Sequence, residues 1–240
     1  MNTRRIQTFI GSVVLAAVGL TIYASLSSHS LHVYYGLVIL VLAAATSRMK
    51  VKLPGINGNM SVNLPFLLLA VANLSAVEAV LVACVSTVVQ CWPNPGSKFK
   101  PEQMLFNVSM MAFATDLAVL AWHASGSAKV WASEPLMLAL ATSAFLLGQT
   151  IPVAGIIKLA EGAALRSVWV SILHLSFPYY VLSAGMTSMV NQASHRFGWQ
   201  VPLLVFPIMY VIHRCYHLYF AGAAQVPREA SFARSASAGM

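Results

Sequence analysis

Residues 52–63 read KLPGINGNMSVN, and they separate two strongly apolar stretches of the chain. The segment contains one proline, two glycines and three asparagines but no acidic residue, a composition typical of a surface loop. The residues that follow, LPFLLLAVANLSAVEAVLVACVSTVVQCW (64–92), predict an apolar helical hairpin. We therefore expect a folded loop on the cytoplasmic side, from which this hairpin begins below the membrane surface. Turns would come from Gly55 and Gly58, while Asn57, Asn59 and Asn63 would satisfy backbone groups that lipid cannot.

The composition identifies the solvent of the whole chain. Hydrophobic residues make up 58% of the 240 residues and charged residues only 8%, against roughly a quarter charged in ordinary soluble domains. So few charges indicate a membrane protein. The net charge is +8, and the basic residues lie in small groups between apolar runs. This pattern favours contact with anionic lipid and excludes a nucleic-acid-binding stripe.

The apolar runs predict an all-α, polytopic helical membrane protein with about eight transmembrane segments. At about 1.5 Å per residue, segment 60–74 reaches only about 22 Å of the roughly 30 Å of hydrocarbon. Residues 1–221 should form one bundle, and 222–240 a disordered cytoplasmic tail. The eight segments are 6–26, 31–47, 60–74, 75–92, 103–123, 135–157, 167–191 and 202–220.

The basic residues predict the orientation. If all eight segments cross, every Lys and Arg except Lys129 and Arg196 lies on the same side as the N-terminus. The positive-inside rule then places both termini in the cytoplasm. Both flanks of the hairpin 60–92 are basic, however. Six spans plus a re-entrant hairpin would give the same charge distribution.

Helix boundaries have clear local signals. Ser75 and Glu78 have the Ser-x-x-Glu spacing of a capping box, so Glu78 is expected to be a cap rather than a functional acid. First-turn positions suit Pro101, Pro135 and Pro202, because the first turn lacks internal amide partners. Three further prolines interrupt apolar runs and should disturb their helices: Pro152, Pro178 and Pro207.

Asp116 is the one acid in the middle of a predicted span. Ser109, Asp116 and His123 are spaced by seven and share a helix face, with Asn107 a little further round. An intramembrane acid must face a partner or a water-filled pocket. Asp116 therefore either hydrogen-bonds a neighbouring helix or lines a ligand or ion site, for which Asn107 is a second candidate.

Two polar breaks supply the remaining ligand-binding candidates. In GQTIP, Gln149 precedes Pro152, and in SILHLSFPYY, His174 and Tyr179 flank Pro178. A proline inside a helix frees a carbonyl four residues earlier. The two breaks could face each other near the middle of the membrane, or could simply pack.

No metal, cofactor or catalytic site is predicted. His213 and His217 are four apart, but no Glu follows the first His, and an interfacial belt suits them better than a metal site. Cys84, Cys91 and Cys215 have no metal-ligand spacing and are expected to be small buried hydrophobes. No nucleophile–base pair or phosphate-binding loop is present, so we expect no enzymatic activity.

Arg48, Lys50 and the stretch KLPGINGNMSVN, together with LFNVSMMA (105–112) and YVIHRCYHLY (210–219), resemble a known membrane region. It is the N-terminal input region of acidobacterial-type signalling proteins, in which it is joined to a cytoplasmic HD-GYP phosphodiesterase or GGDEF cyclase. The resemblance covers roughly residues 48–220. It implies a multi-pass sensory module of the bacterial inner membrane that is linked to cyclic di-GMP turnover. Since no HD or GGDxF motif follows residue 220 here, catalysis is not carried over.

We therefore expect a non-enzymatic sensory module, and a small-molecule transporter or substrate-binding membrane subunit is the alternative. The expected partners are membrane lipid, a cytoplasmic signalling protein, a small-molecule ligand and a second copy of the chain. The broken helices around Asp116, Gln149 and His174 motivate the transporter alternative, because transporters build midplane sites from such breaks.

Overall fold

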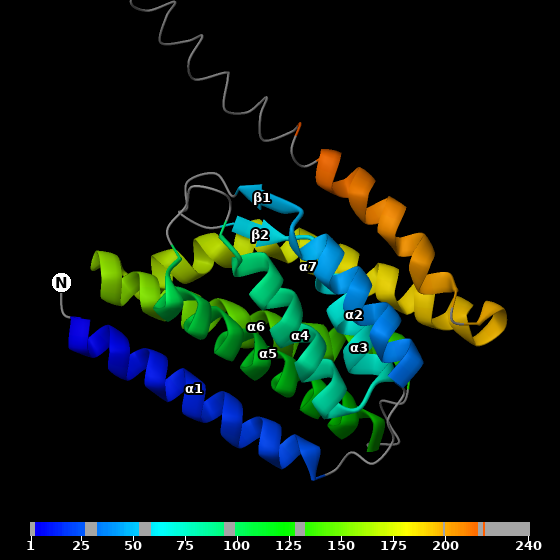
Figure 1. Ribbon diagram of the computed structural model, residues 1–240, viewed down its shortest axis with the longest axis horizontal. Helices are drawn as coiled ribbons and strands as arrows, with labels where there is room; N and C mark the ends of the chain where they lie inside the picture. The colour runs from blue at the N-terminus through cyan, green and yellow to red at the C-terminus, as the bar shows by residue number, and fades with distance from the viewer. Residues whose placement is uncertain are drawn as a thin grey trace, which may run out of the picture.

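The computed structural model describes residues 3–26, 33–52, 59–93, 99–127, 133–198, 200–215 and 218. These residues form a bundle of helices joined by short connections (Figure 1). The predicted tail 222–240 lies outside the described residues. The helices are α1 (Thr3–Ser25), α2 (Val33–Ser47), α3 (Leu64–Asn73), α4 (Ala76–Cys91), α5 (Pro101–Ser127), α6 (Glu134–Glu161), α7 (Leu165–Phe197) and an unnumbered last helix, Val201–Cys215.

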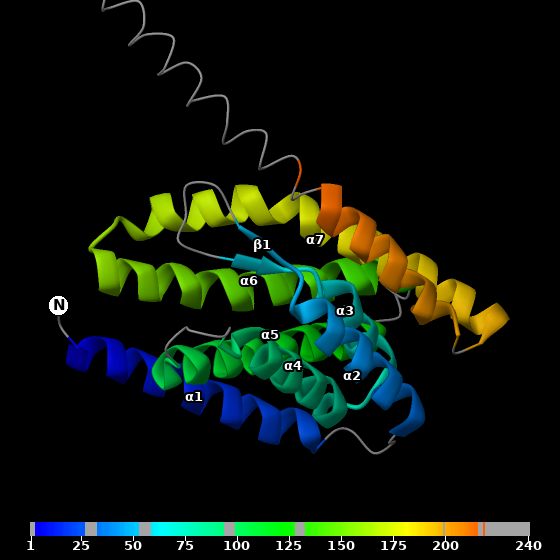
Figure 2. The same cartoon turned by 45° about the horizontal axis from the view of Figure 1, so that its top comes forward.

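The bundle is layered (Figure 2). The helices α4 and α5 lie between α1 on one side and α6 on the other, and α7 packs on the far side of α6. The last helix lies beside α7 in both views. Many large apolar side chains point outward, among them Leu15 and Ile22 of α1 and Phe177 of α7. Lipid suits such surfaces, and four helices are long and apolar enough to cross a membrane: α1, α5, α6 and α7. The fold is that of a helical membrane protein.

One short two-stranded ribbon, which the sequence analysis did not predict, interrupts the helices. Strand β1 (Lys50–Lys52) pairs antiparallel with β2 (Asn59–Ser61), so that Lys50 is opposite Ser61 and Lys52 is opposite Asn59. The ribbon joins the two ends of the predicted loop. Gly55, Asn57 and Gly58 lie outside the described residues.

Helix α3 is the centre of the bundle. All residues from Leu64 to Val71 are buried, because α3 packs against α2, α4, α5, α6 and α7. A helix that is apolar on every side needs such an environment. Its 10 residues span only about 15 Å at 1.5 Å per residue, so it is shorter than the predicted segment.

The turn between α3 and α4 lies beside the first turn of α2. A Cβ placed on Gly36 of α2 would be 3.8 Å from both Leu74 and Glu78. The predicted capping box is confirmed here. The Glu78 amide donates to Ser75 Oγ at 3.3 Å, and the Ser75 amide donates to Glu78 Oε2 at 3.0 Å.

The first-turn prolines are confirmed. Pro101 is the first residue of α5, and Pro135 and Pro202 lie in the first turns of α6 and the last helix. Pro152, Pro178 and Pro207 lie inside α6, α7 and the last helix, each of which continues through its proline. The expected disturbance of these helices stays a prediction. Gly162, with a φ of +72°, ends α6 in the left-handed conformation that favours glycine.

Candidate functional site

Asp116 lies inside the bundle where α5 meets α1. Its side chain is fully buried, and its Oδ2 accepts a hydrogen bond of 2.7 Å from the hydroxyl of Thr21. Its other oxygen, Oδ1, is buried without a hydrogen-bond partner among the described residues. A buried polar atom without a partner is costly. The arrangement gives a carboxylate with one oxygen fixed and the other free to accept a proton, a cation or a donor from a small molecule.

The surroundings of Asp116 come from three helices. Ala17 on α1, Val80 on α4 and Ala112 on α5 form a small apolar cluster against which Cys84 packs. Cys84 also lies within electrostatic range of Asp116. Ala17 and Thr21 are four apart, so they share the face that α1 turns to α5. Ala112 likewise lies one turn before Asp116, so this cluster is next to the contact between Thr21 and Asp116.

Asn107 and His123 do not join Asp116. The Asn107 amide donates to the Cys91 sulfur at 3.3 Å, which links α5 to the end of α4. Ser109 is buried, as the shared face predicts, but His123 is exposed near the end of α5. The predicted face of α5 is therefore buried at Ser109 and Asp116 but does not extend to His123.

The two polar segments do face each other, through Gln149 and Tyr180 rather than through His174. The Tyr180 hydroxyl on α7 donates to Oε1 of Gln149 on α6. Nearby, the Trp169 indole N–H donates to Thr150 Oγ1 at 3.1 Å. His174 does not contribute, because its side chain is exposed and its Nδ1 lies 3.3 Å from the Val170 carbonyl of its own helix.

Tyr179 of α7 contacts the start of α3. Its side chain is buried, and its hydroxyl accepts a hydrogen bond of 3.2 Å from the backbone N–H of Leu64. The first amides of a helix have no internal partner, so Tyr179 satisfies one of them across the bundle. Thr187, two turns further along α7, donates at 3.3 Å to the carbonyl of Pro65.

Asn63 acts differently from the prediction. It precedes α3, yet its side chain makes no capping bond to the backbone. Instead its Oδ1 accepts from Ser61 Oγ at 2.8 Å, and its Nδ2 lies 3.4 Å from Ser86 Oγ of α4. It thereby connects β2 to α4. Nothing is described for the Asn59 side chain.

One further polar pair was not expected from the sequence. Asn191 of α7 donates to Glu134 of α6 at 2.5 Å. Glu134 is also an acid in the first turn of its own helix. The signal that could have found the pair was Asn191 near the end of an otherwise apolar run.

Metal binding has no support among the described residues, which contain no group of three or more His, Cys, Asp or Glu side chains. His213 is half-buried, and His217 lies outside the described residues. Cys84 and Cys91 are half-buried and Cys215 is exposed, so the expectation of three buried cysteines was too simple.

The fold and this interior acid define a helical membrane protein with a polar site enclosed by its helices. The MASE9 family model matches residues 6–219, and the chain belongs to this family of membrane-associated sensory domains. The match extends from the first turns of α1 past the last helix. No curated protein and no solved structure matches the chain.

Proposed function

We propose that the protein is a non-enzymatic sensory input module that passes a signal from the membrane to a cytoplasmic output domain for cyclic di-GMP turnover. The observation that carries the proposal is the family match over residues 6–219, which runs from the first turn of α1 past the end of the last helix described. The resemblance of the loop 52–63 and of residues 210–219 to input regions of HD-GYP and GGDEF proteins supplies the type of output.

The receiving site in this proposal is the enclosed carboxylate of Asp116. A proton, a cation or a small polar ligand at Oδ1 would alter its hydrogen bond with Thr21, and that bond joins α1 to α5. Ligands shift conformation only through differential contacts with the two states. The seating of α1 on α5 is a contact of this kind.

Transmission would use the last helix. Val205 and Met209 are buried against the bundle, while Leu204, Ile208 and Val211 on the same helix are exposed. A helix held on one face can shift as a unit against α7. It would act on a signalling partner in the cytoplasm, either within one chain or between two copies.

The proposed orientation follows the positive-inside distribution, with eight crossings, both termini in the cytoplasm and the bacterial inner membrane as location. The position of the α3–α4 turn beside the start of α2 supports eight crossings over a shallow re-entrant hairpin.

The transporter alternative has no comparable support. The side chains that suggested a midplane site do not converge, because His174 is exposed and the Tyr179 hydroxyl caps α3. Gln149 accepts a hydrogen bond from Tyr180, so its side chain joins α6 to α7 rather than lining a cavity.

The test joins this chain, through its last helix, to a GGDEF cyclase and measures cyclic di-GMP in cells. We expect Asp116→Asn to change the output at equal protein level in the membrane. Glu161→Gln is the matched control, because Glu161 is an exposed acid at the end of α6. Equal output from D116N and the parent fusion would contradict the receiving role of Asp116. Output that is independent of the membrane region altogether would contradict the sensory role.

A further inference from the structure

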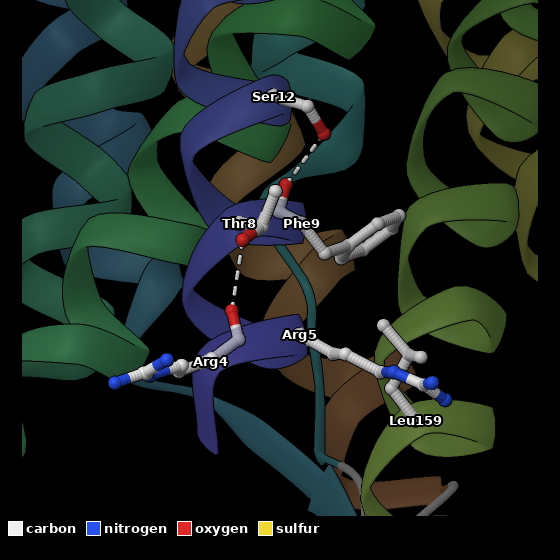
Figure 3. Close-up of a pocket in the computed structure, with 6 residues that line it drawn as sticks. All are labelled: Arg4, Arg5, Thr8, Phe9, Ser12 and Leu159. Carbon is white, nitrogen blue, oxygen red and sulfur yellow. Dashed lines mark hydrogen bonds between the residues drawn. The ribbon is translucent and has the colours of Figure 1, made fainter. Parts of the chain in front are cut away.

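A groove lies between the first turns of α1 and the end of α6 (Figure 3). Its volume is about 450 Å³, and its lining residues are Arg4, Arg5, Thr8, Phe9, Ser12 and Leu159. Five of them come from α1 and one from α6. The groove is distinct from the site around Asp116, and the proposed function does not use it.

The mouth of the groove is cationic. Arg4 and Arg5 are exposed, and neither forms an ion pair within the part of the chain that the structure describes. The Arg5 side chain extends toward Leu159 of α6, whereas Arg4 points away from it on the other side of α1 (Figure 3). Glu102 of α5 accepts a hydrogen bond of 3.4 Å from Gln7.

Lys158, next to Leu159, adds a further exposed positive charge, and Glu161, three residues later in α6, is an exposed acid.

Below the mouth the groove is apolar. Phe9 points toward α6 (Figure 3), where its ring lies so close to Gly155 that a Cβ there would be 2.8 Å from Cζ. The hydroxyls of Thr8 and Ser12 already donate to the carbonyls of Arg4 and Phe9 in their own helix, at 2.9 and 2.7 Å. They are therefore not spare donors for a polar ligand.

The position of the groove fits a lipid. The apolar part of α1 begins at Ile6, directly after the two arginines, so the arginines lie at the level of the headgroups when α1 crosses the membrane. Basic pockets between transmembrane helices at the cytoplasmic surface bind anionic headgroups. Arginine is well suited to phosphate, because its planar donors match the phosphate oxygens.

We propose that this groove binds one anionic phospholipid, with its phosphate at Arg5 and an acyl chain along Phe9 and Leu159, while Arg4 adds positive charge at the same level of the membrane. A free phosphate ion would use the arginine alone and gain nothing from the apolar wall. The bound lipid would hold the start of α1 against the end of α6.

The experiment measures lipid binding to the purified full chain in neutral detergent, by native mass spectrometry. Phosphatidylglycerol, phosphatidylcholine and inorganic phosphate are added in separate arms. We expect phosphatidylglycerol to bind about tenfold or more tighter than phosphatidylcholine, since each basic residue near the surface strengthens anionic lipid binding about fivefold. Arg4→Gln with Arg5→Gln should remove this preference. The control Arg48→Gln with Arg166→Gln removes the same charge from exposed positions outside the groove and should keep it.

A second variant tests the apolar wall without changing charge. Leu159→Trp places a larger side chain in the groove and should weaken phosphatidylglycerol binding, whereas Leu147→Trp, at an exposed position of α6 outside the groove, should not. If the double arginine variant fails to insert into the membrane, the comparison of L159W with L147W still tests lipid binding in the groove. Equal binding of the two lipids, or a preference that survives both R4Q/R5Q and L159W, would overturn the proposal. Inorganic phosphate that competes fully with phosphatidylglycerol would also overturn it, because the arginines would then bind a phosphate ion rather than a lipid.

Discussion

The hydroxyl of Thr21 donates a 2.7 Å hydrogen bond to the carboxylate of Asp116, and this bond joins two helices across 95 residues of sequence. A second link between α1 and α5, from Gln7 to Glu102, is exposed and longer, at 3.4 Å. The bond from Thr21 is thus the interior polar attachment of a helix that is otherwise mostly exposed: only 17% of the most apolar window of α1 is buried. This hydroxyl therefore adds a specific polar contact to the apolar packing of Ile10, Val13 and Ala24 of α1.

Thr21→Val removes this attachment while keeping the shape of the side chain. We expect the free energy of unfolding in detergent to fall by about 1 kcal/mol, in line with interhelical hydrogen bonds in membrane proteins. Thr21→Ser should retain most of the stability, because it keeps the donor. Denaturation followed by circular dichroism measures the change.

Ser25→Ala is the control for this substitution. Among the described residues, the Ser25 hydroxyl bonds to the Ile22 carbonyl of its own helix, so its loss should leave the stability nearly unchanged. A T21V protein as stable as the wild type would show that α1 is held by apolar packing alone.

Gly148→Ala should destabilise the contact between α5 and α6. A Cβ at this position would lie 2.9 Å from the Ala114 Cα and 3.2 Å from its Cβ, so the two backbones must separate. Overpacking of this kind costs about 1–3 kcal/mol, and small residues are what allow membrane helices to approach closely. Thermal unfolding measures the loss. At Gly185 of α7 a Cβ would meet nothing within 4 Å, and Gly185→Ala should be neutral; equal effects of the two substitutions would argue against close packing at Gly148.

Tyr179→Phe should weaken the start of α3. The substitution leaves the Leu64 N–H without its acceptor in a buried position, which costs about 1–3 kcal/mol. Hydrogen exchange at the first turn of α3 should accelerate, and global stability should fall. The control is Tyr210→Phe on the last helix, where the side chain is exposed. Unchanged exchange in Y179F would mean that another group takes over the Leu64 amide.

The sequence predicted features that depend on neighbouring residues. The capping box at Ser75 and Glu78 was identified correctly, because both partners lie within one helical turn. The first-turn prolines were correct for the same reason, and so were most helix boundaries within a few residues. Asp116 was recognised as a buried acid from its type and depth alone.

The partners across the bundle could not be predicted. Thr21 and Asp116 meet because of the rotation of α1 about its axis, and no spacing within α1 specifies this rotation. Pro178 lies close in sequence to Tyr180, which meets Gln149 of α6, but which of His174, Tyr179 and Tyr180 faces α6 depends on how α7 packs against its neighbours. Strands of three residues, Lys50–Lys52 and Asn59–Ser61, are too short for an alternating pattern to reveal.

The last prediction concerns the α3–α4 turn, which decides between eight crossings and a re-entrant hairpin. The turn lies beside Gly36 in the first turn of α2, and α2 and α4 have similar lengths of 15 and 16 residues. The hairpin therefore reaches the end of the bundle from which α2 starts, which the positive-inside distribution assigns to the outside.

Val77, exposed in the first turn of α4, is the position to test. In a chain with Cys84, Cys91 and Cys215 replaced by Ala, Val77→Cys should react with an impermeant maleimide added to intact spheroplasts. Ser133→Cys, before α6, should react in the same way, whereas Ala164→Cys, between α6 and α7, should react only after permeabilisation. If Val77→Cys reacts only after permeabilisation, as Ala164→Cys does, then the turn lies on the cytoplasmic side and α3 and α4 form a re-entrant pair.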